Sequence, residues 1–516
     1  MRANILSKLF ISLFLLEIVF SGCKKNPKVL PAANIPVAGA TRMQLTLDSI
    51  FLYAKETYLW FDALPSYEQF NPRQYNTMSS ELDNYKKELF DITQFKINPK
   101  TAKPFELLTS SSAKYSYITI EGAPGVKTSS VNLEGVGDDF GFALSSVSAN
   151  DIRIRYVNPG SPAAVAGLMR GYRLVKINGT PVRADSQIDV DLINSAFNIQ
   201  SMTLTVEKPD KTSLNANLVK GSYNSNPVVK STVLTTGAKK AGYIVYARFS
   251  SLQNSQGALD NAFADFAAQG IEDIIIDLRY NGGGYVETAQ YLNNLIAPSA
   301  LNGSIMYIEN FNQLMQTNKA PILSKQIIYD SNNKPVKTNG RNATYADVDY
   351  SIAGNTFKFS KKGSLNTIKN AYFIISGSTA SASELVINSL KPYLNVKLIG
   401  EKSYGKPIGF FGIKIDKYTV YMSQFNTKNS AGEGDYFDGF QPDFLATDDV
   451  TRDFGDPSEI SLAKALSLVR TGTAVAANKT MVLQGGIAVN AASVEVNNVT
   501  SDDNFYGLIE GRIKLK

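Results

Sequence analysis

Two side chains in the stretch from Ser376 to Phe410 could do chemistry together, Ser381 and Lys406. Ser381 follows a short apolar run and a small polar turn, which predicts that it lies at the start of a helix. The N–H groups and dipole of a helix start stabilise negative charge, including the oxyanion formed when a serine attacks a carbonyl. Lys406 lies between glycine-rich turns, and an amine that its surroundings desolvate can act as a base near neutral pH.

The composition excludes the more common types of hydrolytic active site. The chain has no histidine, which excludes a Ser-His-Asp triad and a histidine-ligated zinc site. Its single cysteine is Cys23. A serine activated by a lysine is the variant of the triad that remains. The alternative is that Ser381 only caps a helix and Lys406 is a solvated loop residue. Neither interpretation implies a metal or an organic cofactor.

Alternating apolar runs and helical patterns must position these two side chains. We expect a buried strand over 371–376, a helix through Leu385 and Leu390 that stops near Pro392, and a second strand over 396–399. Further upstream, we expect strands over 242–249 and 271–279, with a polar connector over 222–236. The pattern favours an α/β fold.

The residues around the two candidates resemble a known family. The runs Thr379–Glu384 (TASASE) and Gly400–Lys406 (GEKSYGK) are similar to the catalytic segment of the carboxyl-terminal processing proteases, peptidase family S41. The resemblance implies that Ser381 is the nucleophile and Lys406 is the base, on an α/β core of the ClpP/crotonase kind. The family usually has a glutamine four residues after the lysine, where this chain has Phe410.

A second stretch also resembles the family. Asp277–Gly284 (DLRYNGGG) is similar to its Asp-Leu-Arg-x-Asn-x-Gly-Gly motif. The resemblance implies an oxyanion hole formed by the amide of Gly283 or Gly284 and the amide of Ala382. We expect Asp277 and Arg279 to pair and hold this loop. A phosphate-binding loop is disfavoured because no GxxxxGK[ST] pattern is present there.

Residues 126–215 resemble a PDZ domain of the bacterial protease type. The signature is carried by Asn158–Leu168 and by Gly171–Val182, which includes an Asn-Gly hairpin signal. Phe140, Gly141, Phe142 and Ala143 stand where such domains have their carboxylate-binding loop. A peptide bound there would add a strand to an open edge. The alternative is that this domain is only a spacer.

The N-terminal residues predict export. Residues 1–22 have the layout of a secretory signal peptide, and the small residues before Cys23 resemble a bacterial lipobox. We expect lipidation of Cys23, a tether over 23–40, and a protein anchored by lipid to the cell envelope that faces the periplasm or the exterior. The alternative is an uncleaved N-terminal membrane anchor.

The remaining segments complete the predicted domain order. We expect an N-terminal helical domain over 41–125 and a peptidase core over 226–475. Within the core, residues 301–370 form an insertion that we expect as a lid or cap beside the site. Residues 476–516 form a tail without a recognised counterpart. The net charge of +6 comes without a basic stripe, so nucleic acid is not an expected partner.

The resulting expectation is a serine endopeptidase with a Ser-Lys dyad. It would cleave exported proteins or peptides and would recognise their free C-terminal ends through the PDZ domain. The alternative is a catalytically degenerate, peptidase-like lipoprotein that binds peptides without cleaving them, which the Phe410 substitution motivates.

Overall fold

The computed structural model describes residues 39–120, 131–330, 334–472, 507–509 and 514–516. The predicted signal peptide, Cys23, the tether up to residue 38 and most of the predicted tail lie outside the described residues. Every described residue except Gly39 belongs to one unit, Ala40–Lys516. No helix among the described residues is long and apolar enough to span a bilayer.

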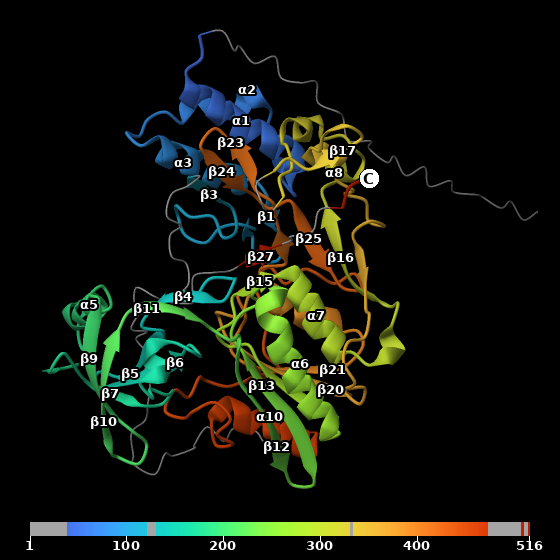
Figure 1. Cartoon of the computed structure of the whole chain (residues 1–516). Helices are drawn as coiled ribbons and strands as arrows, with labels where there is room; N and C mark the ends of the chain where they lie inside the picture. Colours follow the sequence, from blue (N-terminus) through green and yellow to red (C-terminus); the bar gives the residue numbers. More distant parts are fainter. Residues whose placement is uncertain (1–38, 121–130, 331–333, 473–506, 510–513) are drawn as a thin grey trace, which may run out of the picture. The chain divides into compact units, whose positions relative to one another are not determined.

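A six-stranded sheet forms the centre of the predicted peptidase core (Figure 1). Its order is β12 (Val228–Thr236), β13 (Lys239–Tyr246), β14 (Asp273–Asp277), β20 (Asn370–Ile375), β21 (Asn395–Gly400) and β26 (Phe444–Leu445). The strands from β13 to β26 are parallel, and β12 is antiparallel to β13. The predicted polar connector over 222–236 is wrong, because β11 (Gly221–Asn224) and β12 occupy most of it.

Helices cover both faces of this sheet. The helices α6 (Leu252–Ala268), α7 (Val286–Ile296) and α9 (Ala382–Leu390) pack on one face, and α10 (Ile460–Thr471) packs on the other. Along β13, Ile244 and Tyr246 face the first group, whereas Tyr243 and Val245 face α10. This alternation explains why the strands are continuous apolar runs in the sequence. The predicted mixed α/β fold is confirmed.

The N-terminal region is helical, as predicted. Its main helices are α1 (Arg42–Thr57) and α3 (Glu81–Thr93), with the shorter α2 (Tyr67–Phe70). These helices share a core with a three-stranded sheet of β23 (Ile413–Ile415), β24 (Tyr418–Tyr421) and β3 (Tyr117–Ile120). Two of these strands, β23 and β24, follow Lys406 in the sequence. The N-terminal region therefore packs against the chain segment that directly follows Lys406.

The PDZ region contains a sheet in the order β10-β9-β7-β6-β5. The strands are β5 (Phe142–Ser148), β6 (Asp151–Val157), β7 (Arg173–Ile177), β9 (Ser201–Glu207) and β10 (Ser213–Val219), accompanied by α4 (Pro162–Val165) and α5 (Gln187–Ala196). The predicted hairpin joins β7 to β8 (Thr180–Pro181), and Asn178 and Gly179 have φ angles of 50° and 80°. These values suit the turn that Asn-Gly favours.

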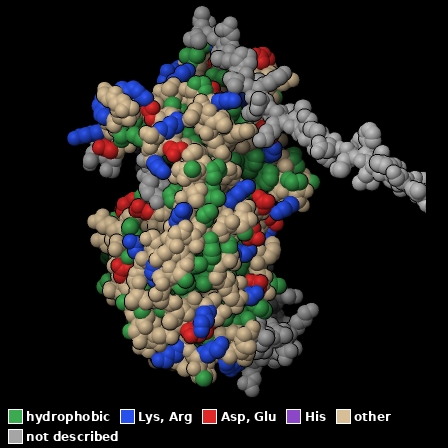
Figure 2. All heavy atoms as spheres, turned by 90° about the vertical axis from the view of Figure 1, so that its right-hand side faces the viewer, with side chains coloured by type: hydrophobic (Ala, Val, Ile, Leu, Met, Phe, Trp, Pro, Cys, Tyr) green, Lys and Arg blue, Asp and Glu red, His purple; other side chains and the backbone are tan. Residues whose placement is uncertain are grey.

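The predicted insertion joins the segment after Lys406 in a second sheet. Its strand β16 (Ile305–Phe311) pairs with β19 (Thr356–Lys358) and with β25 (Phe425–Lys428), which in turn pairs with β22 (Ile408–Gly409). The insertion therefore lies beside the candidate catalytic segment. Its other elements are α8 (Gln313–Gln316), β17 (Lys337–Thr338) and β18 (Arg341–Asn342). On the face drawn in Figure 2, acidic and basic side chains are mixed and form no continuous basic stripe.

Candidate active site

Ser381 occupies a strained position between a strand and a helix. It follows β20 and directly precedes α9, with φ of 61° and ψ of −112°. A serine rarely adopts such a backbone conformation, and strain of this kind concentrates at functional sites. The side chain is 1% exposed, and its Oγ has no hydrogen-bond partner among the described residues. Ser381 is the N-cap residue of α9 by position, and the described hydrogen bonds leave its Oγ unengaged.

Lys406 is buried rather than solvated. Its side chain is 3% exposed, and burial lowers the pKa of its amine to about 7. The negative charges of Glu106 and Glu384 oppose this shift without cancelling it. The ring of Phe410, which stands where the family has glutamine, lies 4.6 Å from the Lys406 Nζ. A neutral amine is therefore accessible near pH 7, which is the property required of a general base.

The buried carboxylate of Glu384 ties the two candidates together. Its Oε2 accepts hydrogen bonds from the backbone N–H of Ser381 (2.9 Å) and of Lys406 (2.8 Å). Its Oε1 accepts from the N–H of Gly405 (2.7 Å) and the hydroxyl of Ser403 (2.5 Å). Burial raises the pKa of Glu384, and these four donors counteract that shift. One carboxylate thus brings together two backbone segments that lie 25 residues apart in sequence.

The N-terminal region forms hydrogen bonds with the loop of residues 403–406, which is called the lysine loop below. The hydroxyl of Tyr115 donates to the carbonyl of Gly405 (2.6 Å), and Lys114 Nζ donates to the carbonyls of Tyr404 (2.9 Å) and Phe437 (2.7 Å). Sequence reasoning assigned no chemistry to this region. Its contacts to the loop carry no sequence signal because they cross roughly 290 residues.

A second buried carboxylate lies in the same region. Glu106 accepts hydrogen bonds from the Tyr58 hydroxyl (3.0 Å) and the Ser423 hydroxyl (2.7 Å). Its charge favours the protonated form of Lys406, as does that of Glu384. The pKa of the Lys406 amine is therefore set by burial, which lowers it, and by the two carboxylates, which raise it.

The glycine loop, Tyr280–Gly284, has backbone angles that favour glycine. Gly283 and Gly284 have φ angles of 106° and 139°. A Cβ on Gly284 would lie 2.0 Å from the carbonyl oxygen of Phe249, so only glycine fits there. The N–H of Gly283 already donates to the Asn281 side chain (2.9 Å). Of the two predicted donors, Gly283 is thus engaged within its own loop.

Hydrogen bonds attach the glycine loop to the segment around Ser381. The carbonyl of Asn281 accepts from the N–H of Ala380 (3.2 Å) and from the hydroxyl of Ser383 (2.9 Å). These contacts flank both Ser381 and Ala382, the other predicted oxyanion donor. Hydrogen bonds therefore connect the glycine loop to the start of α9, and the oxyanion hole stays a prediction. Asn281 was not singled out in the sequence, although it belongs to the quoted motif.

The predicted pairing of Asp277 with Arg279 is present and belongs to a larger buried cluster. Arg279 forms ion pairs with Asp277 (2.8 Å), Asp448 (2.7 Å) and Glu459 (2.9 Å). Both members of the predicted pair have side chains no more than 2% exposed. The cluster anchors the strand that leads into the glycine loop.

The predicted carboxylate-binding loop lies at the start of the edge strand β5. Phe140, Gly141, Phe142 and Ala143 are all buried, and the ring of Phe142 packs 5.0 Å from the ring of Phe197. Within its sheet β5 pairs only with β6. The described residues contain no cluster of three or more acidic, histidine or cysteine side chains suited to a metal ion.

The comparisons with known proteins show which families the chain resembles. Residues 240–445 match the model of peptidase family S41, and residues 130–207 match the PDZ domain model. The chain is 26% identical over 286 residues to the chloroplastic C-terminal processing peptidase of Tetradesmus obliquus, covering 53% of this chain and 52% of that protein. It is 25% identical over 289 residues to a "Probable CtpA-like serine protease" of Staphylococcus aureus, covering 55% of this chain and 47% of that protein. The chain thus spans about half the length of these curated relatives.

A solved structure supports the fold. A Bacteroides fragilis protein assigned to the S41 proteases superposes with a TM-score of 0.51 at 21% identity, over 82% of this chain and 96% of that chain. At this identity the likeness concerns the fold. Two family models match in the expected order and the fold agrees with them: the chain has the mixed α/β fold of the S41 peptidases, its residues 240–445 are similar to that family, and the preceding residues 130–207 are similar to a PDZ domain.

Proposed function

We propose that the chain is a serine endopeptidase in which Ser381 is the nucleophile and Lys406 is the general base. The observation that carries the proposal is the buried amine, whose pKa lies near 7 and whose backbone shares a carboxylate oxygen with that of Ser381. A histidine-free chain needs another group with such a pKa to activate a serine.

The reaction proceeds in two halves. The neutral Lys406 amine takes the proton from Ser381 Oγ as this oxygen attacks the carbonyl carbon of the scissile peptide bond. The resulting tetrahedral intermediate collapses, the C–N bond breaks, and the protonated amine gives its proton to the leaving nitrogen. Water then attacks the acyl ester while the same amine takes its proton. The acyl C–Oγ bond breaks, and the protonated amine returns the proton to Ser381 Oγ.

Backbone amides stabilise the oxyanion of the intermediate. The proposed donors are Ala382, at the start of α9, and Gly284, since the amide of Gly283 donates to Asn281. The dipole of α9 adds to this stabilisation because its positive end lies at Ser381. The strained backbone of Ser381 also supports the proposal, because strain of this kind concentrates at functional sites.

The substrates are proteins or peptides with free C-terminal ends, captured through the PDZ domain. The position of β5 at the end of the strand order supports this step, because a bound peptide would extend the sheet there. Lipidation at Cys23 and a location at the cell envelope remain proposals from the sequence. If both proposals hold, the substrates are exported proteins.

A peptide-holding protein without turnover is the second candidate. Phe410 favours it, because an aromatic ring contacts the Lys406 amine where the family has an amide that could orient it. A ring attracts an ammonium but fixes its direction less than a hydrogen bond does.

Cleavage of an unfolded protein and of a labelled C-terminal peptide by matched variants tests the proposal. We expect Ser381→Ala and Lys406→Ala to lose at least about 10³-fold in kcat/KM while they still bind the peptide. Lys406→Arg keeps a cation but removes the neutral base, so it should be equally inactive. Activity that survives in Ser381→Ala would refute the assignment. Peptide binding by the wild type without turnover would establish the second candidate.

A further inference from the structure

The chain's own C-terminal segment lies against the candidate active site. The strand β27 (Gly507–Ile509) pairs in parallel with β15 (Gly283–Tyr285), with Gly283 opposite Gly507 and Tyr285 opposite Ile509. β27 also contacts β22, which begins two residues after Lys406. A strand of the tail therefore contacts both the loop of the proposed oxyanion donors and the segment that carries the proposed base. Figure 1 shows β27 next to β15.

The end of the chain is held by the insertion. Leu515 forms an antiparallel bridge with Val348. The N–H of Asp349 donates to the carbonyl of Lys514 (2.9 Å), and the N–H of Lys516 donates to the carbonyl of Asp347 (2.9 Å). Both described pieces of the tail thus bind through backbone pairing, which does not depend on their side chains. This is how extended peptides add to a sheet edge.

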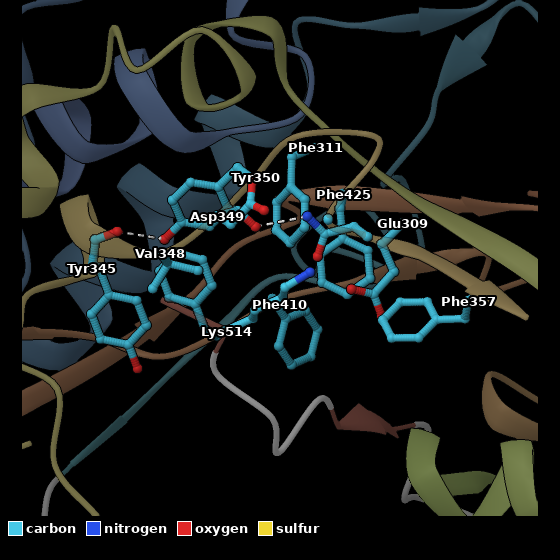
Figure 3. Close-up of a pocket in the computed structure, with 13 residues that line it drawn as sticks. Glu309, Phe311, Tyr345, Val348, Asp349, Tyr350, Phe357, Phe410, Phe425 and Lys514 are labelled. Atoms are coloured by element: carbon cyan, nitrogen blue, oxygen red, sulfur yellow. Dashed lines mark hydrogen bonds between the residues drawn. The ribbon is translucent and has the colours of Figure 1, made fainter. Parts of the chain in front are cut away.

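Lys514 lines a pocket of about 240 Å³ together with Phe410 (Figure 3). Aromatic residues make up most of its wall: Phe311, Phe357, Phe410, Phe411, Phe425, Tyr345 and Tyr350. Two carboxyl-bearing residues, Glu309 and Asp349, also line it. Phe410 is shared between this pocket and Lys406, since its ring is 4.6 Å from the Lys406 Nζ. The pocket and the proposed base are therefore separated by one side chain.

The lining of the pocket suits a lysine side chain. Aromatic rings accommodate the four-carbon stem and attract the ammonium, and the carboxylates supply the opposite charge. Nearby positive charges of Lys514 and Lys516 contribute to a lowered pKa of Asp349, after its hydrogen bonds to Ser351. A pocket with only apolar walls would instead select an aliphatic or aromatic side chain.

We propose that the edge of β15 and the pocket lined by Lys514 form one peptide-binding groove of the peptidase core, distinct from the PDZ domain, and that the chain's own tail occupies it through Gly507–Ile509 and residues 514–516. The groove takes an extended peptide as a strand beside β15 and holds a lysine side chain at the pocket of Glu309, Asp349 and Phe410. The inference deepens the proposed function, because it names the substrate class of the same site. A substrate must displace the tail, which competes at a high effective concentration because it is tethered.

Disulfide trapping in the full chain tests the docking of the tail. Val348→Cys with Leu515→Cys, in a Cys23→Ser background, places two thiols at a bridged antiparallel pair, where the Cα separation suits a disulfide. We expect rapid intramolecular cross-linking, detected by mass spectrometry of the unreduced digest. The matched control is Ile188→Cys with Leu515→Cys, which uses an exposed residue of α5. Cross-linking no faster than in this control would overturn the docking.

The same trap reports on activity. We expect oxidation of the 348/515 pair to lower cleavage at least tenfold and reductant to restore it. Full activity of the cross-linked protein would contradict occupation of the substrate path. If no form cleaves any substrate but the pair still cross-links rapidly, the proposed endopeptidase activity fails while the groove and its occupant stand.

A peptide with the sequence of 507–516, GLIEGRIKLK, tests the lysine preference without turnover. The receptor is the full chain with Ser381→Ala, and Lys514→Glu to loosen its own tail. We expect the peptide with alanine in place of Lys514 to bind at least tenfold more weakly in fluorescence anisotropy, while alanine in place of Lys516 changes binding less than threefold. Equal binding of the two alanine peptides and the parent peptide would refute the lysine pocket.

Discussion

At the scale of single residues, the chemistry depends on the protonation of Lys406. Burial lowers the pKa of this amine to about 7, and the neutral amine is the form that the proposed mechanism requires. We therefore expect kcat/KM to rise with pH through about 7 and to level off above it. A pH–rate profile from pH 5 to 9 measures this. A profile that is flat over this range would contradict the assignment of Lys406 as the base.

The same shift makes a prediction about stability. The amine has its ordinary pKa of 10.5 in the unfolded chain, so between pH 7 and 10.5 the unfolded state binds more protons than the folded state. Folding stability of the wild type therefore rises with pH in this window through this group. In Lys406→Met the contribution is absent. The stability advantage of the variant, measured by urea unfolding at pH 7 and pH 9, should shrink as the pH rises.

Substitutions of Phe410 test whether its ring contributes to the desolvation of the Lys406 amine. The ring is buried and lies beside Tyr117 and Tyr421, at centroid distances of 5.7 Å and 5.6 Å. Phe410→Gln introduces an amide that can accept a hydrogen bond from the ammonium, which favours the charged form. We expect the acid limb of the pH–rate profile to move up by about one unit. Phe410→Leu keeps an apolar wall and should leave the limb in place; a shift in the leucine variant alone would count against this explanation.

At the scale of elements, Glu384 joins the start of α9 to the lysine loop. Glu384→Gln keeps the shape but replaces one acceptor oxygen by a donor, which faces N–H groups that then lack a partner. We expect a loss of about 2 kcal/mol in the free energy of unfolding and a fall in kcat. Glu287→Gln, at an exposed glutamate in the first turn of α7, is the matched control and should change neither. Equal stability of the two variants would show that the carboxylate does not organise the site.

The sequence predicted the elements that have local signals and missed those defined by distant partners. The strand before Ser381, the helix after it and the glycine loop follow from apolar runs, turns and glycines, because these signals are short-range. The β12 segment looked like a polar connector because it is an edge strand, and its half-exposed residues show no buried run. Glu384 lies at the third helical position, where a capping signal could have indicated its bond to the Ser381 N–H. Its bonds to the lysine loop could not be foreseen, since they depend on the tertiary fold.

At the scale of the whole molecule, contacts between distant segments complete the site. Tyr115, from the N-terminal region, holds the carbonyl of Gly405, and the tail strand pairs with the glycine loop. Neither contact has a sequence pattern of its own. The resemblance to a family indicated the peptidase core and the PDZ domain but not these additions, because it rests on residues 130–210 and 240–470.

The PDZ region is linked to the glycine loop through Arg170. Its guanidinium is 1% exposed and pairs with Asp448 (2.5 Å), and it donates to the hydroxyl of Tyr280 (2.7 Å) and to the carbonyl of Arg452 (3.0 Å). Tyr280 immediately follows Arg279 and immediately precedes Asn281. One buried side chain of the PDZ region therefore contacts both the buried ion cluster and the loop that carries the proposed oxyanion donors.

Removing this side chain should affect both stability and catalysis. Arg170→Ala leaves Asp448 with Arg279 as its remaining cation and opens a space beside Tyr280, so we expect a loss of about 3 kcal/mol in the free energy of unfolding. Arg183→Ala removes an exposed ion pair with Asp185 in the same region and should cost less than about 1 kcal/mol.

Chemical denaturation compares the stabilities of the two variants, and kcat measured on a short peptide reports whether the glycine loop has moved. A drop in kcat with unchanged PDZ peptide affinity would mean that Arg170 positions the loop. Unchanged kcat in a destabilised Arg170→Ala variant would mean that the PDZ region supports the fold without acting on the loop.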